Sequence, residues 1–232
     1  QPADASNLRI SELHYNPLDP TSAELQAIPG VDNNSFEFVE LLNVSESTIS
    51  LDGVRFTEGI AFDFSSANEL LLGSGETILI VQNRDAFEVR YGNDLPIAGE
   101  YSGKLSGSGE DLELVDAMGK VIQAFEFEDD SPWPEASDGD GPSLESRDPL
   151  GDPTQGSNWT ASTADGGTPG FATVPLLGDY DRNGFVDQMD RSIWISQYGS
   201  TVVAPGFGAD GNRDGVIDTA DYTVWRDQLG QN

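Results

Sequence analysis

Two segments in the last quarter of the chain place acidic and amide side chains at the same intervals. Segments 179–190 and 210–221 align at a constant offset of 31 residues, and each has Asp or Asn at positions 1, 3, 5, 9 and 12 and Gly at position 6. The alignment extends beyond both segments through the matching pairs Trp194 and Trp225, Gln197 and Gln228, and Gly199 and Gly230. A repeat kept over this length indicates two copies of one supersecondary unit.

Oxygen-bearing side chains at these positions are typical of the calcium-binding loop of an EF-hand. Calcium is a hard cation that takes six to eight oxygen ligands at about 2.3–2.6 Å, so the loop must turn its side chains towards one point. Gly184 and Gly215 permit the sharp turn that this requires. Position 7 contributes a backbone carbonyl, and position 12 closes the site. We therefore expect two calcium ions, held by Asp179, Asp181, Asn183, Phe185, Asp187, Asp190, Asp210, Asn212, Asp214, Val216, Asp218 and Asp221.

Position 12 departs from the usual EF-hand loop, which closes with a Glu that binds the metal through both oxygens. Asp190 and Asp221 stand there instead, and because Asp is shorter the helix must begin closer to the ion. Val186 and Ile217, at position 8, are expected to pair the two loops through their apolar side chains. Ordinary Asp-Gly turns are the alternative, but two complete loops in register disfavour it.

With both loops, the following helices and their spacing in agreement, residues 176–230 resemble a type I dockerin domain. In that family the first helix of the EF-hand is missing. The resemblance implies that partner choice lies at loop positions 10 and 11 and on the following helix. Those positions are Gln188-Met189 and Thr219-Ala220, not the repeated Ser-Thr type of pair of many cellulosomal dockerins. The resemblance therefore implies the calcium sites and leaves a cohesin-like partner open.

The helices after the loops carry apolar residues that are expected to form a small core. These residues are Met189, Ile193, Trp194, Val224, Trp225 and Leu229. Ile195 and Tyr198 are expected to remain exposed. The stretch from Leu176 to Asn232 holds nine Asp and four Arg, a net charge of −5. We expect two bound calcium ions to cancel most of this charge and their removal to loosen the module.

The whole chain of 232 residues has a formal net charge of −30, no Cys and one His. Such a surface repels nucleic acid and anionic membranes and attracts cations, although solubility alone also explains it. Acidity together with calcium sites favours a secreted or cell-surface protein, and without Cys there is no disulfide or thiolate metal site. Gln1 fits a mature terminus left after cleavage, and it fits a trimmed chain equally well. No apolar run approaches the roughly 20 residues of a membrane-spanning helix.

Residues that could perform catalysis are few. A Ser-His-Asp triad could use only His14, which lies on an expected strand and is expected to have a structural or exposed role. Paired carboxylates such as Glu37 and Glu40 are expected by chance in so acidic a chain, so they give little support for a glycosidase. The sequence therefore predicts a protein that is not an enzyme.

The residues before the loops are expected to form a sandwich. Short β-prone runs separated by Gly, Asn, Asp and Ser are typical of an antiparallel sandwich. The runs are Leu8–Leu13, Phe36–Leu42, Ile49–Phe56, Thr77–Val81, Leu112–Val115 and Val121–Phe127. Leu8, Ile10 and Glu12 alternate with the residues between them and are expected on one face. Arg84–Tyr91, followed by Gly92, is expected to form one short helix.

Residues 131–170 are rich in Pro, Gly, Ser and Asp. They also contain Trp133 and Trp159, and a disordered linker rarely carries tryptophans. We expect an ordered loop that packs both indoles on the sandwich. Residues 168–174 are expected to form the linker to the repeated loops.

Seven pieces of the first 170 residues occur in the order found in bacterial lamin-tail domains. They are Leu8–Pro17, Glu37–Leu41, Leu51–Phe56, Ser108–Leu114, Phe127–Asp130 with Trp133-Pro134, Gly141–Glu145 and Asn158-Trp159. Residues 7–170 thus resemble this family. The resemblance implies an immunoglobulin-like sandwich that has no shared catalytic residues and occurs as an accessory module on exported bacterial proteins.

The expected architecture is mainly β, with a lamin-tail-like sandwich at residues 1–172 and a small helical dockerin-like domain at 176–232. We expect an extracellular calcium-binding structural protein that assembles at the cell surface or in a matrix or filament, with head-to-tail self-association as one form of assembly. The alternatives are an interaction module that docks onto a cohesin-like partner and an accessory portion of a larger exported hydrolase.

Overall fold

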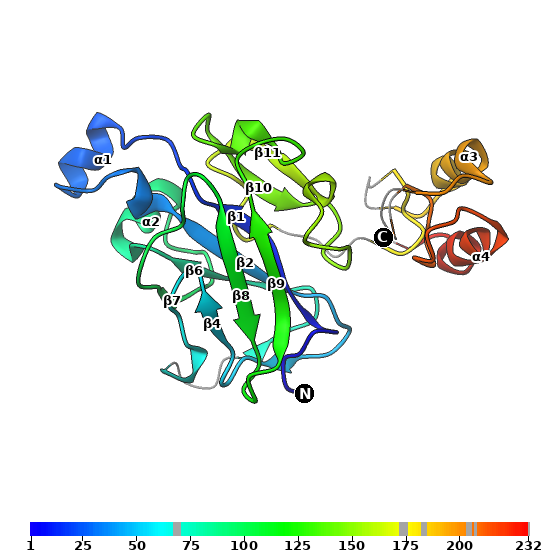
Figure 1. Ribbon diagram of the computed structural model, residues 1–232, viewed down its shortest axis with the longest axis horizontal. Helices are drawn as coiled ribbons and strands as arrows, with labels where there is room; N and C mark the ends of the chain where they lie inside the picture. The colour runs from blue at the N-terminus through cyan, green and yellow to red at the C-terminus, as the bar shows by residue number, and fades with distance from the viewer. Residues whose placement is uncertain (67–70, 172–175, 182–184, 203–205, 207, 232) are drawn as a thin grey trace. The chain divides into compact units, whose positions relative to one another are not determined.

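The computed structural model describes residues 1–66, 71–171, 176–181, 185–202, 206 and 208–231 (Figure 1). The chain divides into two compact units. The first unit contains Gln1–Arg147 and Pro153–Thr173, and the second contains Asp148–Asp152 and Val174–Asn232.

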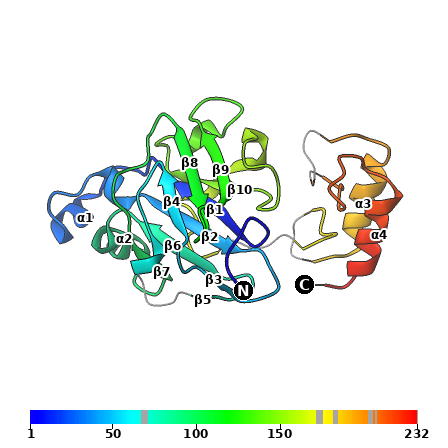
Figure 2. The same cartoon turned by 60° about the horizontal axis from the view of Figure 1, so that its bottom comes forward.

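The first unit packs a six-stranded sheet against a three-stranded sheet (Figures 1 and 2). The large sheet has the order β11-β10-β1-β2-β6-β7, formed by Trp159–Asp165, Pro142–Ser146, Leu8–His14, Phe38–Asn43, Thr77–Val81 and Ile97–Glu100. The small sheet has the order β4-β8-β9, formed by Arg55–Glu58, Glu110–Val115 and Val121–Phe127. A separate pair joins β3 (Ile49–Ser50) to β5 (Leu71–Leu72). One core fills the space between the sheets, where Ile10 and Leu41 belong to the same buried cluster as Leu112 and Phe125.

Short helices and turns accompany the sheets of the first unit. They are α1 (Ser22–Ala27), α2 (Arg84–Tyr91) and the 3-10 turns η1 (Asn33–Phe36), η2 (Phe64–Ser66), η3 (Glu135–Ser137) and η4 (Gly156–Asn158). Helix α2 packs on the face of the large sheet that is turned away from the main core, where Phe87 meets Phe38 with ring centroids 5.6 Å apart. The Asn83 side chain caps the start of α2, and Gly92 ends it with φ 88°.

Several predictions for the first unit are confirmed. The bounds of β6, β9 and α2 are those that the sequence predicts, and the fold is mainly β with an immunoglobulin-like sandwich. The prediction of an antiparallel sandwich is confirmed for most strand pairs but is wrong for β6 and β7, which are parallel. Helix α2 lies between these two strands in the chain, and a crossover of this kind returns the second strand in the direction of the first.

A bulge in β1 changes which side chains reach the core. The register between β1 and β2 shifts between Ile10 and Glu12. Leu8 and Ile10 therefore face the core, but Leu13 instead of Glu12 is the next β1 side chain to do so. The predicted alternation is thus wrong at Glu12, because one extra residue moves all later side chains to the opposite face.

The predicted packing of the two tryptophans is confirmed. Trp133 and Trp159 are both buried, and their rings stack 5.9 Å apart. Phe125 of β9 completes the stack at 5.2 Å from Trp159. The prediction that residues 131–170 are a loop is wrong in part, because this segment contains β10 and β11. Small polar residues obscure the strand pattern there, although Leu144 of β10 enters the core.

Three glutamates lie side by side on the outer face of the large sheet. Glu12 on β1 pairs in register with Glu40 on β2 and with Glu145 on β10. We refer to Glu12, Glu40 and Glu145 as the glutamate ladder. Glu12 and Glu40 are buried. Burial raises the pKa of Glu12 to about 8 and that of Glu40 to about 7, despite hydrogen bonds that favour the ionised form.

A glycine-rich segment, residues 166–170, covers the glutamate ladder, and we refer to it as the strap. The Thr168 N–H donates to Glu12 Oε1 at 2.8 Å, and the Thr168 hydroxyl donates to Glu145 Oε1 at 2.6 Å. The Gly170 N–H donates to Glu40 Oε2 at 2.6 Å. Residues 168–170 are therefore fixed on the sandwich, and the prediction that the linker begins at Thr168 is wrong. The rest of the predicted linker, apart from residue 171, lies outside the described residues.

The second unit contains two helices, α3 (Gln188–Gln197) and α4 (Thr219–Gln228). Each helix starts in a capping box formed by the side chains at loop positions 9 and 12, which are Asp187 with Asp190 and Asp218 with Asp221. No helix in the described part of the chain is long and apolar enough to cross a membrane.

Candidate metal centre

The first loop, residues 179–190, brings three carboxylates together. One oxygen each from Asp179, Asp181 and Asp190 lie within 4.8 Å of one another. Asp190 is fully buried and accepts hydrogen bonds from the N–H groups of Tyr180 at 2.7 Å, Asp181 at 3.0 Å and Asp187 at 2.7 Å. Its carboxylate is therefore held in place by the loop that it closes.

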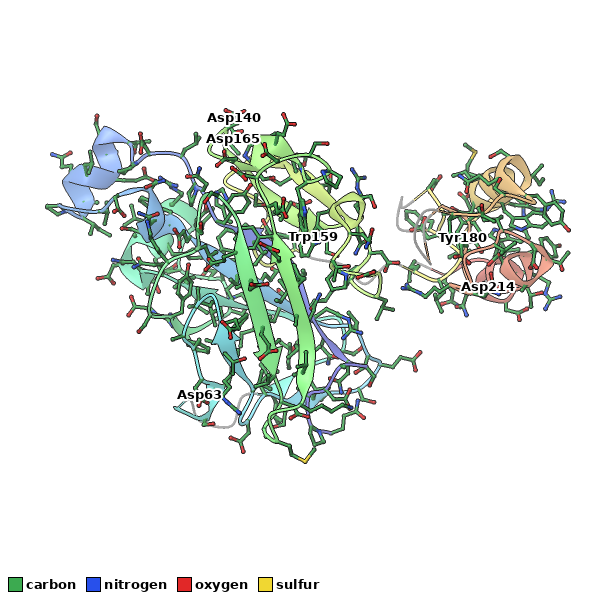
Figure 3. All side chains as sticks on the ribbon, viewed as in Figure 1. Asp63, Asp140, Trp159, Asp165, Tyr180 and Asp214 are labelled. Atoms are coloured by element: carbon green, nitrogen blue, oxygen red, sulfur yellow. The ribbon has the colours of Figure 1, made fainter. Side chains whose placement is uncertain are left out.

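The second loop, residues 210–221, repeats the hydrogen bonds to the closing Asp, although its carboxylates are not among the described groups whose oxygens all lie within 4.8 Å of one another (Figure 3 labels Asp214). Asp221 is fully buried and accepts from the N–H groups of Asn212 at 3.0 Å and Asp218 at 2.7 Å. Asp210 is also buried and accepts from the N–H groups at positions 5 and 6, at 3.2 and 2.9 Å. The Asn212 amide donates to Asp214 Oδ2 at 2.8 Å. The side chains at positions 1, 3, 5 and 12 are thus tied into one compact loop.

The remaining predicted ligands fall into two groups. Phe185 and Val216, at position 7, have exposed side chains, as expected of residues that would contribute only a backbone carbonyl. Asn183 and the turn residue Gly184 lie outside the described residues. The predicted ligands at position 9 also cap the helices. The Asp187 and Asp218 side chains accept hydrogen bonds from N–H groups of the first helical turn at 2.6 and 2.7 Å.

The helix surfaces depart from the sequence prediction at two residues. Met189 is 61% exposed and Leu229 is 47% exposed, although both are predicted in the helix core. Met189 occupies position 11, in the first turn of α3. Ile195 and Tyr198 are exposed as predicted, at 52% and 53%.

His14, the one histidine of the chain, is far from solvent. It is fully buried and packs edge-on against Phe38, with ring centroids 5.6 Å apart. Neither ring nitrogen has a hydrogen-bond partner among the described residues. Burial lowers the pKa of His14 to about 3, so the ring is neutral at physiological pH. Of the two expected roles, the structure therefore favours the structural one over the exposed one.

The family model described as Lamin Tail Domain matches residues 1–129 of the chain. The chain belongs to the lamin tail domain family. No curated protein and no solved structure matches it. The family match ends before β10 and β11, yet both strands extend the large sheet beyond β1. The lamin tail sandwich of this chain is therefore larger than the matched segment, and the second unit lies outside the match.

The donor chemistry of the first loop fits a hard divalent cation. All three converging groups are carboxylates, and hard cations such as calcium take oxygen ligands. Like charges at this separation repel one another, and a cation between them replaces that repulsion by attraction. These carboxylates are close enough together to share one ion.

Proposed function

We propose that the second unit is a calcium-binding module of the type I dockerin kind that holds two ions. The observation that carries this proposal is the convergence of Asp179, Asp181 and Asp190 within 4.8 Å, in a loop whose spacing recurs 31 residues later. The ion in the first loop is held by these three groups with Asn183, the Phe185 carbonyl and Asp187. The ion in the second loop is held by Asp210, Asn212, Asp214, the Val216 carbonyl, Asp218 and Asp221. When bound, calcium supplies a positive charge that holds each acidic loop closed.

The whole chain acts as a non-catalytic structural protein outside the cell, at the cell surface or in a matrix or filament. The lamin tail sandwich presents a surface, and the second unit makes a calcium-dependent attachment. The net charge of −30 supports the role of calcium, because chains of this charge repel one another until cations reduce the repulsion. Head-to-tail contact between copies is the form of assembly that we propose, and contacts of that kind generate rings or open filaments.

A specific observation favours a second candidate function, docking onto a cohesin-like partner. The two helices of the second unit differ in what they expose. Helix α3 exposes Met189 and Ile195, whereas the residues 31 positions later on α4 are Ala220 and Arg226. Exposed apolar side chains on α3 that have no apolar counterparts on α4 suit a single partner rather than two equivalent ones.

Isothermal titration of the intact chain with calcium tests the proposed metal function. We expect about two sites in the wild type and about one in either Asp179→Ala or Asp210→Ala, because each variant removes the first ligand of one loop. Asp227→Asn is the matched control, since it removes one exposed carboxylate of the same unit outside both loops. A wild-type chain that binds no calcium contradicts the proposal.

Light scattering separates the two modes of attachment. We expect the purified chain to gain mass in millimolar calcium and to return to the monomer mass in chelator. A chain that stays monomeric in calcium contradicts self-assembly and leaves docking onto a separate partner as the function of the module.

A further inference from the structure

Each helix of the second unit is hydrogen-bonded to the loop of the other repeat. The Trp194 indole N–H on α3 donates to the carbonyl of Asp218, position 9 of the second loop, at 2.7 Å. The Trp225 indole N–H on α4 donates to the carbonyl of Asp187, position 9 of the first loop, at 2.6 Å. The donors are 31 residues apart and so are the acceptors, so the two bonds are equivalent and crossed.

The backbone follows the same crossed arrangement. Val186 of the first loop exchanges two hydrogen bonds with residues 230–231, which follow α4, at 2.9 and 3.0 Å. Ile217 of the second loop exchanges two with residues 199–200, which follow α3, at 2.8 and 2.9 Å. The two position-8 residues are both buried, but their backbones pair with the end of the opposite repeat rather than with each other. Each loop is therefore anchored by the other repeat at positions 8 and 9.

Position 9 is also the residue that orients the closing carboxylate. The Asp187 N–H donates to Asp190 Oδ2 and the Asp218 N–H donates to Asp221 Oδ2, both at 2.7 Å. The same residue thus receives the indole of the opposite helix at its carbonyl and positions the closing Asp through its amide. A tryptophan that fixes position 9 fixes the side chain that must close on the ion.

The two indoles also belong to one aromatic cluster, in which the rings are tilted against one another. The Tyr222 ring lies 5.0 Å from Trp194 and 5.4 Å from Trp225, measured between centroids. A further bond runs in one direction only, from the Tyr180 hydroxyl in the first loop to the Asp221 carbonyl in the second, at 2.8 Å (Figure 3 labels Tyr180). The counterpart of Tyr180 in the second loop is Gly211, where an added Cβ would meet the Tyr180 hydroxyl.

We propose that Trp194 and Trp225 are positioning residues that control calcium affinity across the repeat, so that each tryptophan governs the site of the other loop. This inference rests on the proposed calcium function and adds the coupling between its two sites. Trp194 holds the second loop in its closed form, and Trp225 holds the first. Filling one site orders the helix that anchors the other loop, so the two ions bind with positive cooperativity.

Trp194→Phe and Trp225→Phe test the crossing, because Phe keeps an aromatic ring and loses the indole N–H donor together with the five-membered part of the indole. Each is combined with Asp210→Ala, which leaves the first site, or with Asp179→Ala, which leaves the second. We expect Trp194→Phe to weaken the second site about fivefold and to leave the first within about twofold, as the loss of one hydrogen bond implies. Trp225→Phe is expected to do the reverse. Tyr198→Phe, an exposed ring 5.1 Å from Trp194, is the control that changes neither site.

Hydrogen exchange of the calcium-loaded intact chain gives a readout that is independent of affinity. We expect Trp225→Phe to increase amide exchange at residues 187–190 and not at 218–221, and Trp194→Phe to do the opposite. Weakening of the site in the same repeat, or equal weakening of both sites, overturns the crossed coupling while wild-type binding still supports the metal function. A wild-type chain that binds no calcium overturns both.

Discussion

Two clusters of carboxylates in this chain use the same chemical group in opposite ways. In the glutamate ladder, Glu12, Glu40 and Glu145 come from three neighbouring strands, and each accepts hydrogen bonds from the strap. In the first loop of the second unit, Asp179 and Asp190 converge with a third carboxylate within 4.8 Å. Within the described part of the chain, neither the ladder nor the second loop is among the carboxylate groups that come this close.

From this difference we expect the ladder to serve the structure of the sandwich and the first loop to bind a metal. The ladder accepts hydrogen bonds from the hydroxyls of Ser11, Ser143 and Thr168 and from backbone N–H groups of the strap. We therefore expect it to hold the strap without a cation. The carboxylates of the first loop face one another, and a bound cation would relieve their mutual repulsion. Removing calcium should therefore destabilise the second unit and leave the glutamate ladder unchanged. Changes to the strap should destabilise the sandwich and leave the second unit unchanged.

Chelation is expected to give the largest effect. A ligand that binds only the folded state stabilises it by about 4 kcal/mol at a concentration a thousand times its Kd, and two sites double this. We expect two thermal transitions in calorimetry, of which the one from the second unit shifts far down in chelator and the one from the sandwich stays. A single transition that ignores calcium would show that the two clusters do not differ as described.

Gly167→Ala is expected to destabilise the sandwich next most strongly. An added Cβ at Gly167 clashes with Glu12 Oε1 and with the Ser143 side chain, and the backbone there has φ 83°. We expect a loss of about 2–4 kcal/mol in the free energy of unfolding of the sandwich, with or without calcium.

Gly75→Ala is the matched control for that substitution. Gly75 also has a positive φ, 70°, but an added Cβ there meets nothing within 4 Å. Its cost is therefore only the left-handed backbone, about 1 kcal/mol. Equal losses in the two variants would show that the contact between strap and ladder contributes little.

The stability of the sandwich is expected to fall as the pH rises from about 5 to about 8. The pKa values of Glu12 and Glu40 are raised from 4.5 to about 8 and about 7, chiefly by burial. In this range the folded state therefore binds more protons than the unfolded state, so its free energy of unfolding decreases with pH and levels off above about 8. Glu12→Gln, which cannot ionise, should flatten this dependence in denaturant titrations run in excess calcium. Stability that rises over the same range would mean that the hydrogen bonds from Ser143 and Thr168 outweigh burial.

Single substitution of a tryptophan gives the smallest expected effect. The loss of the Trp225 indole N–H removes one hydrogen bond and should change one calcium site about fivefold. The result to compare is the calcium affinity of each site. Weaker binding at the first loop alone supports the crossed arrangement, whereas weaker binding at both loops would indicate that the whole unit is destabilised.

The sequence predicts the candidate metal residues because their spacing is local. All the side chains of one site lie within twelve consecutive residues, so composition and position are enough to suggest the ligands. Strand β9 and helix α2 are predictable for the same reason, since alternation and the flanking Asn83 and Gly92 mark them in the sequence.

The glutamate ladder and the crossed tryptophans could not be predicted in this way. Glu12, Glu40 and Glu145 are far apart in the chain, and only the register of β10, β1 and β2, which includes a bulge, brings them together. Trp194 and Trp225 are visible as a repeated pair, but the sequence does not tell which loop each indole reaches. Both features depend on tertiary pairing, which the local pattern does not encode.

Crystals of the intact chain grown in calcium test the central claim most directly, through anomalous scattering by the bound ion. The account predicts two calcium peaks, one about 2.3–2.6 Å from the carboxylate oxygens of Asp179, Asp181 and Asp190 and one at the same distance from Asp210, Asn212 and Asp214. It predicts no peak at the glutamate ladder. Calcium at the ladder, or loops without calcium at saturating concentration, would contradict it.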